Sequence, residues 1–280
     1  METFDAPDGT RLAVHRLGTG RPLICLPGGP MQASAYLGDL GGLSARRTLI
    51  RPDPRGTGES AAPADPASYR VDRQVGDVEA LAAHAGVSRF DLLAHSAGAT
   101  LALLYAARHP DRIDRLVLVN PSPRPVDVAV TGDDRLAVAG TRRGEPWFPD
   151  AFAALERITS DRAGDGDGAA ITPFLYGRWD DDTRRYAARQ DEQRNLDAAR
   201  AYYAGDPFDP ADVRSALAGR SAPVLLVAGE RDLQLPPHRA AEYAALFPVA
   251  ELEVLPGGGH FAWRDEPDRF VRAVTAFLDR

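Results

Sequence analysis

Ser96 stands where a serine hydroxyl can act as a nucleophile. Phe90, Leu92 and Leu93 indicate a buried strand, the sequence Ala94-His95-Ser96-Ala97-Gly98 follows, and a helical pattern continues to residue 108. A serine on such a sharp strand-to-helix turn projects its hydroxyl above the sheet, and small residues on both sides let the backbones approach. Alanine stands where this nucleophile-elbow motif usually begins with glycine, and a serine that caps an ordinary helix is the structural alternative. The motif therefore needs support from the rest of the chain.

Two polar residues near the other end of the chain can activate this serine. An apolar run at 223–228 leads to Asp232, and a second run at 249–255 leads through three glycines to His260. Residues just past the carboxyl ends of parallel strands lie where such sheets bind ligands. A serine hydroxyl needs an imidazole to take its proton and a carboxylate to hold that imidazole. We therefore expect His260 as base and Asp232 as acid, with Glu230 as the alternative acid and a turn role as the alternative for Asp232.

The other histidines are weaker candidates for the base. His95 adjoins the serine, so its ring is poorly placed to reach back to that hydroxyl, and His109 lies at a predicted helix end. His15, His84 and His238 have no glycine-rich loop or strand end to present them. We expect surface or packing roles for these five, with His95 also a candidate for substrate contact.

Two further motifs resemble the α/β-hydrolase superfamily, and within it the proline iminopeptidase-like branch. Pro27-Gly28-Gly29-Pro30 is similar to the family's His-Gly-Gly-Pro oxyanion loop, with proline in place of histidine. The run from Asp53 to Ser60 matches the family's Asp-x-Arg-Gly-x-Gly-x-Ser pattern at every fixed position. The chain order Ser, Asp, His is also the family's order. The resemblance implies the fold more specifically than it implies the substrate.

The resemblance assigns supporting roles to these two motifs. Acyl transfer places negative charge on an oxygen, and the backbone amides of Gly29 and Ala97 are the expected donors to it. The run that begins at Asp53 is expected to be scaffold, with Asp53 and Arg55 paired across a tight turn. Candidates for substrate contact are more dispersed along the chain: Gly28, His95, Trp147, Tyr176, Trp179 and Glu192.

Composition excludes several classes of protein. The 280 residues are 44% apolar and carry a net charge of −7, which allows a large core and argues against nucleic-acid binding. The amino terminus has no signal-like segment, and no apolar run has the length of a membrane helix, so we expect a soluble, cytoplasmic protein. The single cysteine, Cys25, is expected to be a small buried hydrophobe. No residue spacing predicts a metal or another cofactor, and the sequence makes no prediction of oligomeric state.

The order of predicted elements indicates an α/β fold. An opening hairpin at 2–4 and 12–17 precedes an alternation of strands and helices, which predicts a mostly parallel, doubly wound sheet. The further predicted strands are 23–26, 48–51, 90–95, 116–120, 224–228 and 251–255. The predicted helices are 71–85, 97–108, 239–247 and 267–278. The core domain is therefore expected to comprise residues 1–120 and 216–280.

Residues 121–215 break the alternation and are expected to form a helical cap domain. They hold about half of the chain's aromatic residues in about a third of its length, which suggests an apolar roof over the pocket, although packing of the cap accounts for most of them. Glu192 is the expected anchor for the amino group of a peptide substrate, whereas Asp180, Asp181 and Asp182 fit the start of a helix better.

Two classes of function remain open on the sequence. The first is a serine hydrolase that forms an acyl-enzyme on a small ester, a lactone or an N-terminal prolyl amide. Its partner would be a small molecule or a short peptide. The second is a ligand-binding protein of the same fold without turnover. The complete set of Ser96, Asp232 and His260 favours the enzyme.

Overall fold

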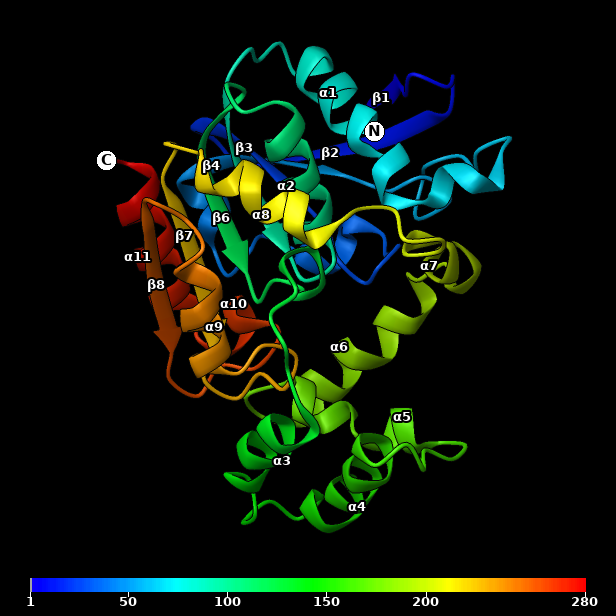
Figure 1. The fold of residues 1–280 in the computed structure, drawn as a ribbon, viewed down its shortest axis with the longest axis vertical. Helices are drawn as coiled ribbons and strands as arrows, with labels where there is room; N and C mark the ends of the chain where they lie inside the picture. Colours follow the sequence, from blue (N-terminus) through cyan, green and yellow to red (C-terminus); the bar gives the residue numbers. More distant parts are fainter. Residues whose placement is uncertain (1) are drawn as a thin grey trace.

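An eight-stranded sheet forms the centre of the computed structural model, which describes residues 2–280 (Figure 1). The strand order is β1-β2-β4-β3-β5-β6-β7-β8. The pairs β1–β2 and β2–β4 are antiparallel and every other pair is parallel. The strands are β1 Glu2–Asp5, β2 Arg11–Leu17, β3 Arg21–Leu26, β4 Arg47–Pro52, β5 Phe90–His95, β6 Ile113–Val119, β7 Val224–Gly229 and β8 Ala250–Leu255. The predicted fold class and all the predicted strands are therefore confirmed.

Helices cover both faces of the sheet. Alternate side chains of β3 separate into two cores, because Ile24 and Leu26 face one side while Leu23 and Cys25 face the other. The first face packs against α1 Val75–His84, α2 Gly98–Arg108, α8 Pro210–Ala218 and α9 Pro237–Ala244. The second packs against the short 3₁₀ segments Ser34–Leu37 and Leu43–Ala45 and against α10 Ala262–Asp265 and α11 Pro267–Leu278. Cys25 is fully buried, as expected, and burial raises the pKa of its thiol.

The strand register brings five chain segments to one edge of the sheet. Leu26 pairs with Ala94, His95 with Val119, and Gly229 with Leu255, so these strands end nearly level. The segments that follow β3, β5, β6, β7 and β8 consequently meet above the sheet. They contain the oxyanion loop, Ser96, Asn120, Asp232 and His260.

The inserted segment consists of helices joined by turns and loops, and its described residues include no strand. Its helices are α3 Gly132–Gly140, α4 Phe148–Thr159, α5 Asp167–Ala170, α6 Asp181–Glu192 and α7 Leu196–Tyr202. Figure 1 shows α3 to α6 beyond the carboxyl ends of β6 and β8, while α7 returns toward the other end of the molecule. The Asp180 side chain accepts a hydrogen bond from Thr183 N and caps α6, as expected for this acidic run.

Two helix boundaries differ from the predictions, whereas the division into two domains stays a prediction. The expected domain boundary between residues 215 and 216 lies within α8, whose side chains Val213 and Leu217 pack in the same core as α2. The helix predicted at 71–85 begins with a 3₁₀ turn at Val71–Arg73 before α1 starts. The helix predicted at 239–247 starts earlier, because Pro237 is favourable at its first position. Within residues 2–280, no helix is long and apolar enough to cross a membrane.

The predicted pairing of Asp53 with Arg55 is wrong. Asp53 Oδ2 accepts Glu59 N of the same turn at 3.0 Å, and Asp53 Oδ1 accepts Ser34 N of the segment after β3 at 2.8 Å. Gly58 has a φ of +52°, and a Cβ there would lie 2.2 Å from Asp53 Oδ2, so the turn requires glycine.

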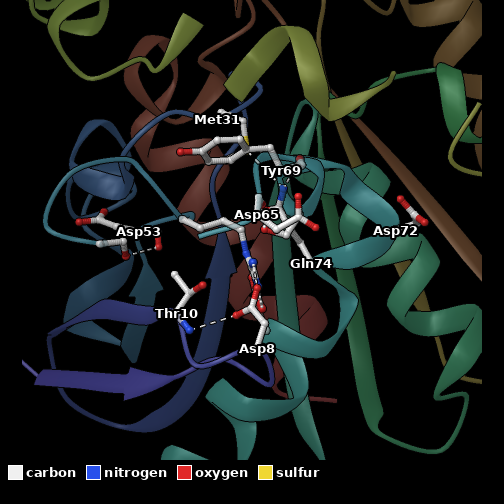
Figure 2. Close-up of polar contacts among 12 residues, drawn as sticks. Asp8, Thr10, Met31, Asp53, Asp65, Tyr69, Asp72 and Gln74 are labelled. Carbon is white, nitrogen blue, oxygen red and sulfur yellow. Dashed lines mark hydrogen bonds and ion pairs between the residues drawn. The ribbon is translucent and has the colours of Figure 1, made fainter. Parts of the chain in front are cut away.

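Arg55 instead points toward Asp77 on α1 and Asp8 in the first hairpin. Its Nε and Nη2 contact the Asp77 carboxylate at 2.8 and 2.5 Å, and its Nη1 contacts Asp8 Oδ2 at 2.5 Å. Asp8 also accepts Thr10 N at 3.0 Å, a contact drawn in Figure 2. The buried guanidinium thus joins the hairpin, the turn after β4 and helix α1.

Asp77→Asn should lower the free energy of unfolding by about 3 kcal/mol. The change removes one charge of a buried pair and leaves the Arg55 guanidinium incompletely compensated. Urea denaturation measures the loss. The control is Asp114→Asn, which breaks the Arg89–Asp114 pair at 2.7 Å, whose arginine side chain is 59% exposed; it should cost less than about 1 kcal/mol. Equal losses in the two variants would contradict a special role for Arg55.

Candidate active site

Ser96 occupies a strained turn between β5 and α2. Its φ of +51° lies in the left-handed region that non-glycine residues seldom adopt. Ser96 N donates to Val119 O at 3.1 Å, and Ser96 O accepts from Ser122 N at 3.0 Å. A Cβ on Gly98 would lie 2.4 Å from Pro27 O, so the second small residue of the motif is required by close backbone approach. The turn therefore has the geometry that the sequence motif predicts.

The structure brings the three predicted catalytic side chains together. His260 Nε2 lies 2.9 Å from Ser96 Oγ, and His260 Nδ1 lies 3.0 Å from Asp232 Oδ2. Asp232 is fully buried and its Oδ1 accepts Gln234 N at 2.8 Å. The alternative acid, Glu230, accepts Gly257 N at 2.8 Å and is exposed. Asp232 is therefore the carboxylate that orients this imidazole.

The two predicted oxyanion amides lie beside Ser96 in the same pocket. Within residues 2–280, neither Gly29 N nor Ala97 N donates a hydrogen bond to the protein, so both are free for a ligand. Gly29 has a φ of +114°, and a Cβ there would lie 2.7 Å from the Gln32 side chain. Ala97 immediately precedes α2, whose amino-terminal dipole also favours negative charge.

The cap holds the oxyanion loop through its backbone. Arg194 Nη2 donates to Gly29 O at 2.9 Å, and Asn195 N donates to Met31 O at 3.0 Å. Ala33 N donates to Gln193 O at 2.9 Å. The loop after β3 is thus bonded to the junction between α6 and α7, a contact that the sequence analysis did not identify.

His95 links the oxyanion loop to the loop of His260. Gly28 N donates to Tyr36 Oη at 2.7 Å, and Tyr36 Oη lies 2.8 Å from His95 Nδ1. His95 Nε2 lies 2.9 Å from the carbonyl oxygen of His260, which must be an acceptor. The Nε2 proton therefore stays on His95, and Tyr36 donates to Nδ1. Burial, followed by the neighbouring His260, lowers the pKa of His95 well below its ordinary value and keeps the ring neutral.

Asn120 provides the second support for the His260 loop. It follows β6 and is fully buried, and its Nδ2 donates to Gly259 O at 2.9 Å and to His260 O at 2.7 Å. Its Oδ1 accepts Gly229 N at 2.8 Å. The sequence analysis did not identify Asn120. Its position as a polar residue at the end of the predicted strand 116–120 could have indicated this role.

A pocket of about 320 Å³ opens above Ser96, a size suited to a small ligand. Of the predicted site residues, Gly29, His95, Ser96, Ala97 and His260 line it, while Asp232 lies behind His260. The other lining residues are Pro30, Gln32, Asn120, Ser122, Pro123, Arg124, Leu175, Gln190, Arg194, Tyr203, Gln234 and Phe261. The cap thus contributes mainly polar side chains, in contrast to the expected apolar roof.

Five predicted substrate contacts lie outside this pocket. The Gly28 amide is used by Tyr36, and Trp147 packs edge-on against Phe174 with centroids 5.0 Å apart. Tyr176 stacks on Phe261 at 5.0 Å and is itself covered by Trp179 at 5.5 Å. Tyr176, with Trp179 against it, packs the cap onto the core, whereas Trp147 packs on another cap residue.

Glu192 is the fifth of these residues. It is exposed near the carboxyl end of α6, two positions after the pocket residue Gln190. Residues two apart on a helix point in different directions, which explains why Gln190 reaches the pocket and Glu192 does not. The expected anchor for a substrate amino group is therefore absent from this position.

One group of side chains outside the pocket has the spacing of metal ligands. His15, Asp53 and Glu59 present ligand atoms within 4.8 Å of one another. His15 Nε2 lies 3.0 Å from Asp53 Oδ2 and 3.6 Å from Glu59, so the imidazole already contacts both carboxylates. We interpret the group as a hydrogen-bonded support of the Asp53 turn.

His95 should make stability depend on pH below about 6.5. Because its folded-state pKa is depressed, the unfolded chain binds a proton there before the folded protein does, so the free energy of unfolding falls as pH decreases. One such group adds a slope of at most about 1.4 kcal/mol per pH unit. Urea denaturation from pH 7.5 to 5 should show a shallower slope for His95→Gln than for the wild type. Identical slopes would show that His95 is protonated without cost.

Comparisons with known proteins support the fold and the family. Residues 21–267 match the family described as alpha/beta hydrolase fold. An N-formylmaleamate deformylase of Pseudomonas putida is 29% identical, and the match covers 94% of this chain and 90% of that protein. An esterase from Exiguobacterium antarcticum superposes with a TM-score of 0.74 at 19% identity over 99% of both chains.

A proline iminopeptidase from Mycobacterium smegmatis superposes with a TM-score of 0.72 at 23% identity, over 99% of this chain and 98% of that one. Identities this low show a shared fold and leave the substrate open. The family match spans strands β3 to β8, the cap and the segments that carry Ser96, Asp232 and His260. The chain belongs to the α/β-hydrolase fold family.

Proposed function

We propose that this protein is a serine hydrolase that cleaves a small ester or amide through a covalent acyl-enzyme on Ser96. The hydrogen-bonded chain from buried Asp232 through His260 to Ser96, at the floor of a small pocket, carries the proposal. A deformylase and an esterase among the similar proteins agree with hydrolysis of an acyl bond. The Ser96 hydroxyl and two free amides supply the nucleophile and the charge stabilisation that this chemistry requires.

The reaction proceeds in two symmetrical halves. Ser96 Oγ attacks the substrate carbonyl carbon while His260 Nε2 takes the hydroxyl proton, and the amides of Gly29 and Ala97 stabilise the oxyanion. The tetrahedral intermediate collapses, and His260 returns the proton to the departing alcohol or amine. Water then attacks the acyl-enzyme, again with His260 as base, and releases the acid and free Ser96. Asp232 holds the imidazole tautomer and stabilises the imidazolium.

Cleavage of an N-terminal prolyl amide has less support. The resemblance to proline iminopeptidases implies an acidic cap residue that binds the free amine, but Glu192 is exposed outside the pocket. No aspartate or glutamate is among the described residues that line the pocket. An ester, or an amide without a free amino group, therefore fits the site better than a peptide amino terminus.

Ser96→Ala should lower kcat for p-nitrophenyl butyrate by at least about 10⁴-fold, because the nucleophile is lost. A serine-directed phosphonate should label the wild-type protein at Ser96, as mass spectrometry of the digest would show. Prolyl-p-nitroanilide, assayed in parallel, should be hydrolysed much more slowly than the ester.

The matched control is Ser122→Ala, which removes another hydroxyl from the same pocket and should leave the phosphonate on Ser96. Labelling of a different residue, or full activity of Ser96→Ala, would refute the mechanism. Wild-type protein that neither turns over nor is labelled would instead indicate a ligand-binding protein of this fold.

A further inference from the structure

The active-site pocket has an unusual charge for this chain. Acidic residues make up 40 of the 280 residues and exceed the basic ones, yet none of the 17 residues that line the pocket is acidic. Two arginines, Arg124 and Arg194, do line it. Asp232, the nearest carboxylate of the catalytic machinery, is fully buried behind His260 and hydrogen-bonded there. A ligand above Ser96 therefore faces positive charge.

Arg194 lies directly beside the oxyanion loop. Its Nη2 donates to Gly29 O at 2.9 Å, which fixes one end of the planar guanidinium while the others of its five N–H donors remain. Among residues 2–280, no carboxylate lies within ion-pair distance of it. Its charge is therefore not neutralised by the protein.

Arg124 lies at the start of the cap segment, shortly after β6 and directly after the pocket residues Ser122 and Pro123. Its guanidinium lies over the Tyr203 ring, 4.8 Å from the centroid. Tyr203 is held in turn by a 2.9 Å hydrogen bond between its hydroxyl and Thr100 Oγ1. Stacking on an aromatic face orients an arginine without neutralising it. No ion pair to Arg124 occurs in the described part of the chain either.

The neutral lining residues are of both kinds. The side chains of Gln32, Gln190 and Gln234 line the pocket, and Gln32 Nε2 donates to Gln190 Oε1 at 3.1 Å. Pro30, Leu175 and Phe261 add apolar surface. The pocket can therefore hold a polar group and a hydrocarbon portion of the same substrate.

We infer that the substrate is an ester or amide that carries a carboxylate, which Arg124 and Arg194 bind while its acyl carbon lies at Ser96. Arginine is suited to this task because its fork of N–H donors matches the two oxygens of a carboxylate. The inference rests on the proposed serine hydrolase and specifies its substrate class. It assigns binding roles to two residues that the catalytic chain does not include.

Two pairs of esters test the inference, each differing only in charge. Mono-(4-nitrophenyl) adipate and its methyl ester place or remove a carboxylate on the acyl side. 4-(Carboxymethyl)phenyl butyrate and its methyl ester do the same on the leaving-group side. In at least one pair, kcat/KM for the carboxylate should exceed that for the methyl ester by about 10-fold, the scale of one charge-assisted contact. The pair that shows the preference identifies the side on which the carboxylate binds.

Arginine variants assign that preference to residues. The ratio of kcat/KM within the responding pair should fall about 5- to 10-fold in Arg124→Gln and in Arg194→Gln, and further in the double variant. Arg→Lys at each position should retain part of the preference for the carboxylate. The matched control is Arg189→Gln, an exposed arginine of α6 outside the pocket, in which the ratio should stay as in the wild type. Because both esters are assayed with the same variant, a general loss of activity lowers both kcat/KM values equally and leaves their ratio unchanged.

The outcomes separate the two proposals. The inference of an anionic substrate would be overturned if the methyl esters were cleaved as fast as the carboxylates in both pairs, or if the preference for the carboxylate remained in the double variant. Either result would leave the proposed serine hydrolase intact. Full hydrolysis of any of these esters by Ser96→Ala would instead overturn the serine mechanism, whatever the charge preference.

Discussion

Close contact between two backbones at the carboxyl edge of the sheet controls the rest of this site. The turn at Ser96 and the loop after β3 approach so closely that a Cβ on Gly28 would lie 2.8 Å from the Ser96 Cβ. Gly29 and Ser96 both line the same pocket. The proposed nucleophile and the proposed oxyanion donors are therefore positioned by backbone geometry, which packing holds more rigidly than flexible side chains can.

Backbone strain gathers at the same edge. Ser96 and Asn120 follow neighbouring strands, and both are non-glycine residues with positive φ, +51° and +43°. Asparagine tolerates the left-handed region better than most residues. Its buried side chain bonds Gly229, Gly259 and His260, and thus links three loops. The hydrogen bonds that the strained residues make offset the cost of their conformation.

The sequence was most informative where local rules act. Runs rich in apolar residues predicted strands β3 to β8, and the order of polar residues at strand ends predicted which side chains meet, because parallel strands end at one edge. It was least informative where contacts depend on helix orientation. Nothing local distinguishes Gln190, which faces the pocket, from Glu192, which does not, until the axis of α6 is known. Arg55 likewise pairs with Asp77 and Asp8, which are 22 and 47 residues away, and not with Asp53. Contacts at such separations depend on the tertiary fold.

The bonds between the cap and the oxyanion loop limit how this protein can move. Gly29, Met31 and Ala33 each bond the short junction at Gln193, Arg194 and Asn195. A hinged opening of α6 would have to break these bonds and would disturb the loop to which the proposed mechanism assigns charge stabilisation. Under that mechanism, an open cap and a correctly placed Gly29 amide exclude each other. Substrate would then enter while the cap stays bonded to the loop, and loosening the cap would lower the reactivity of Ser96.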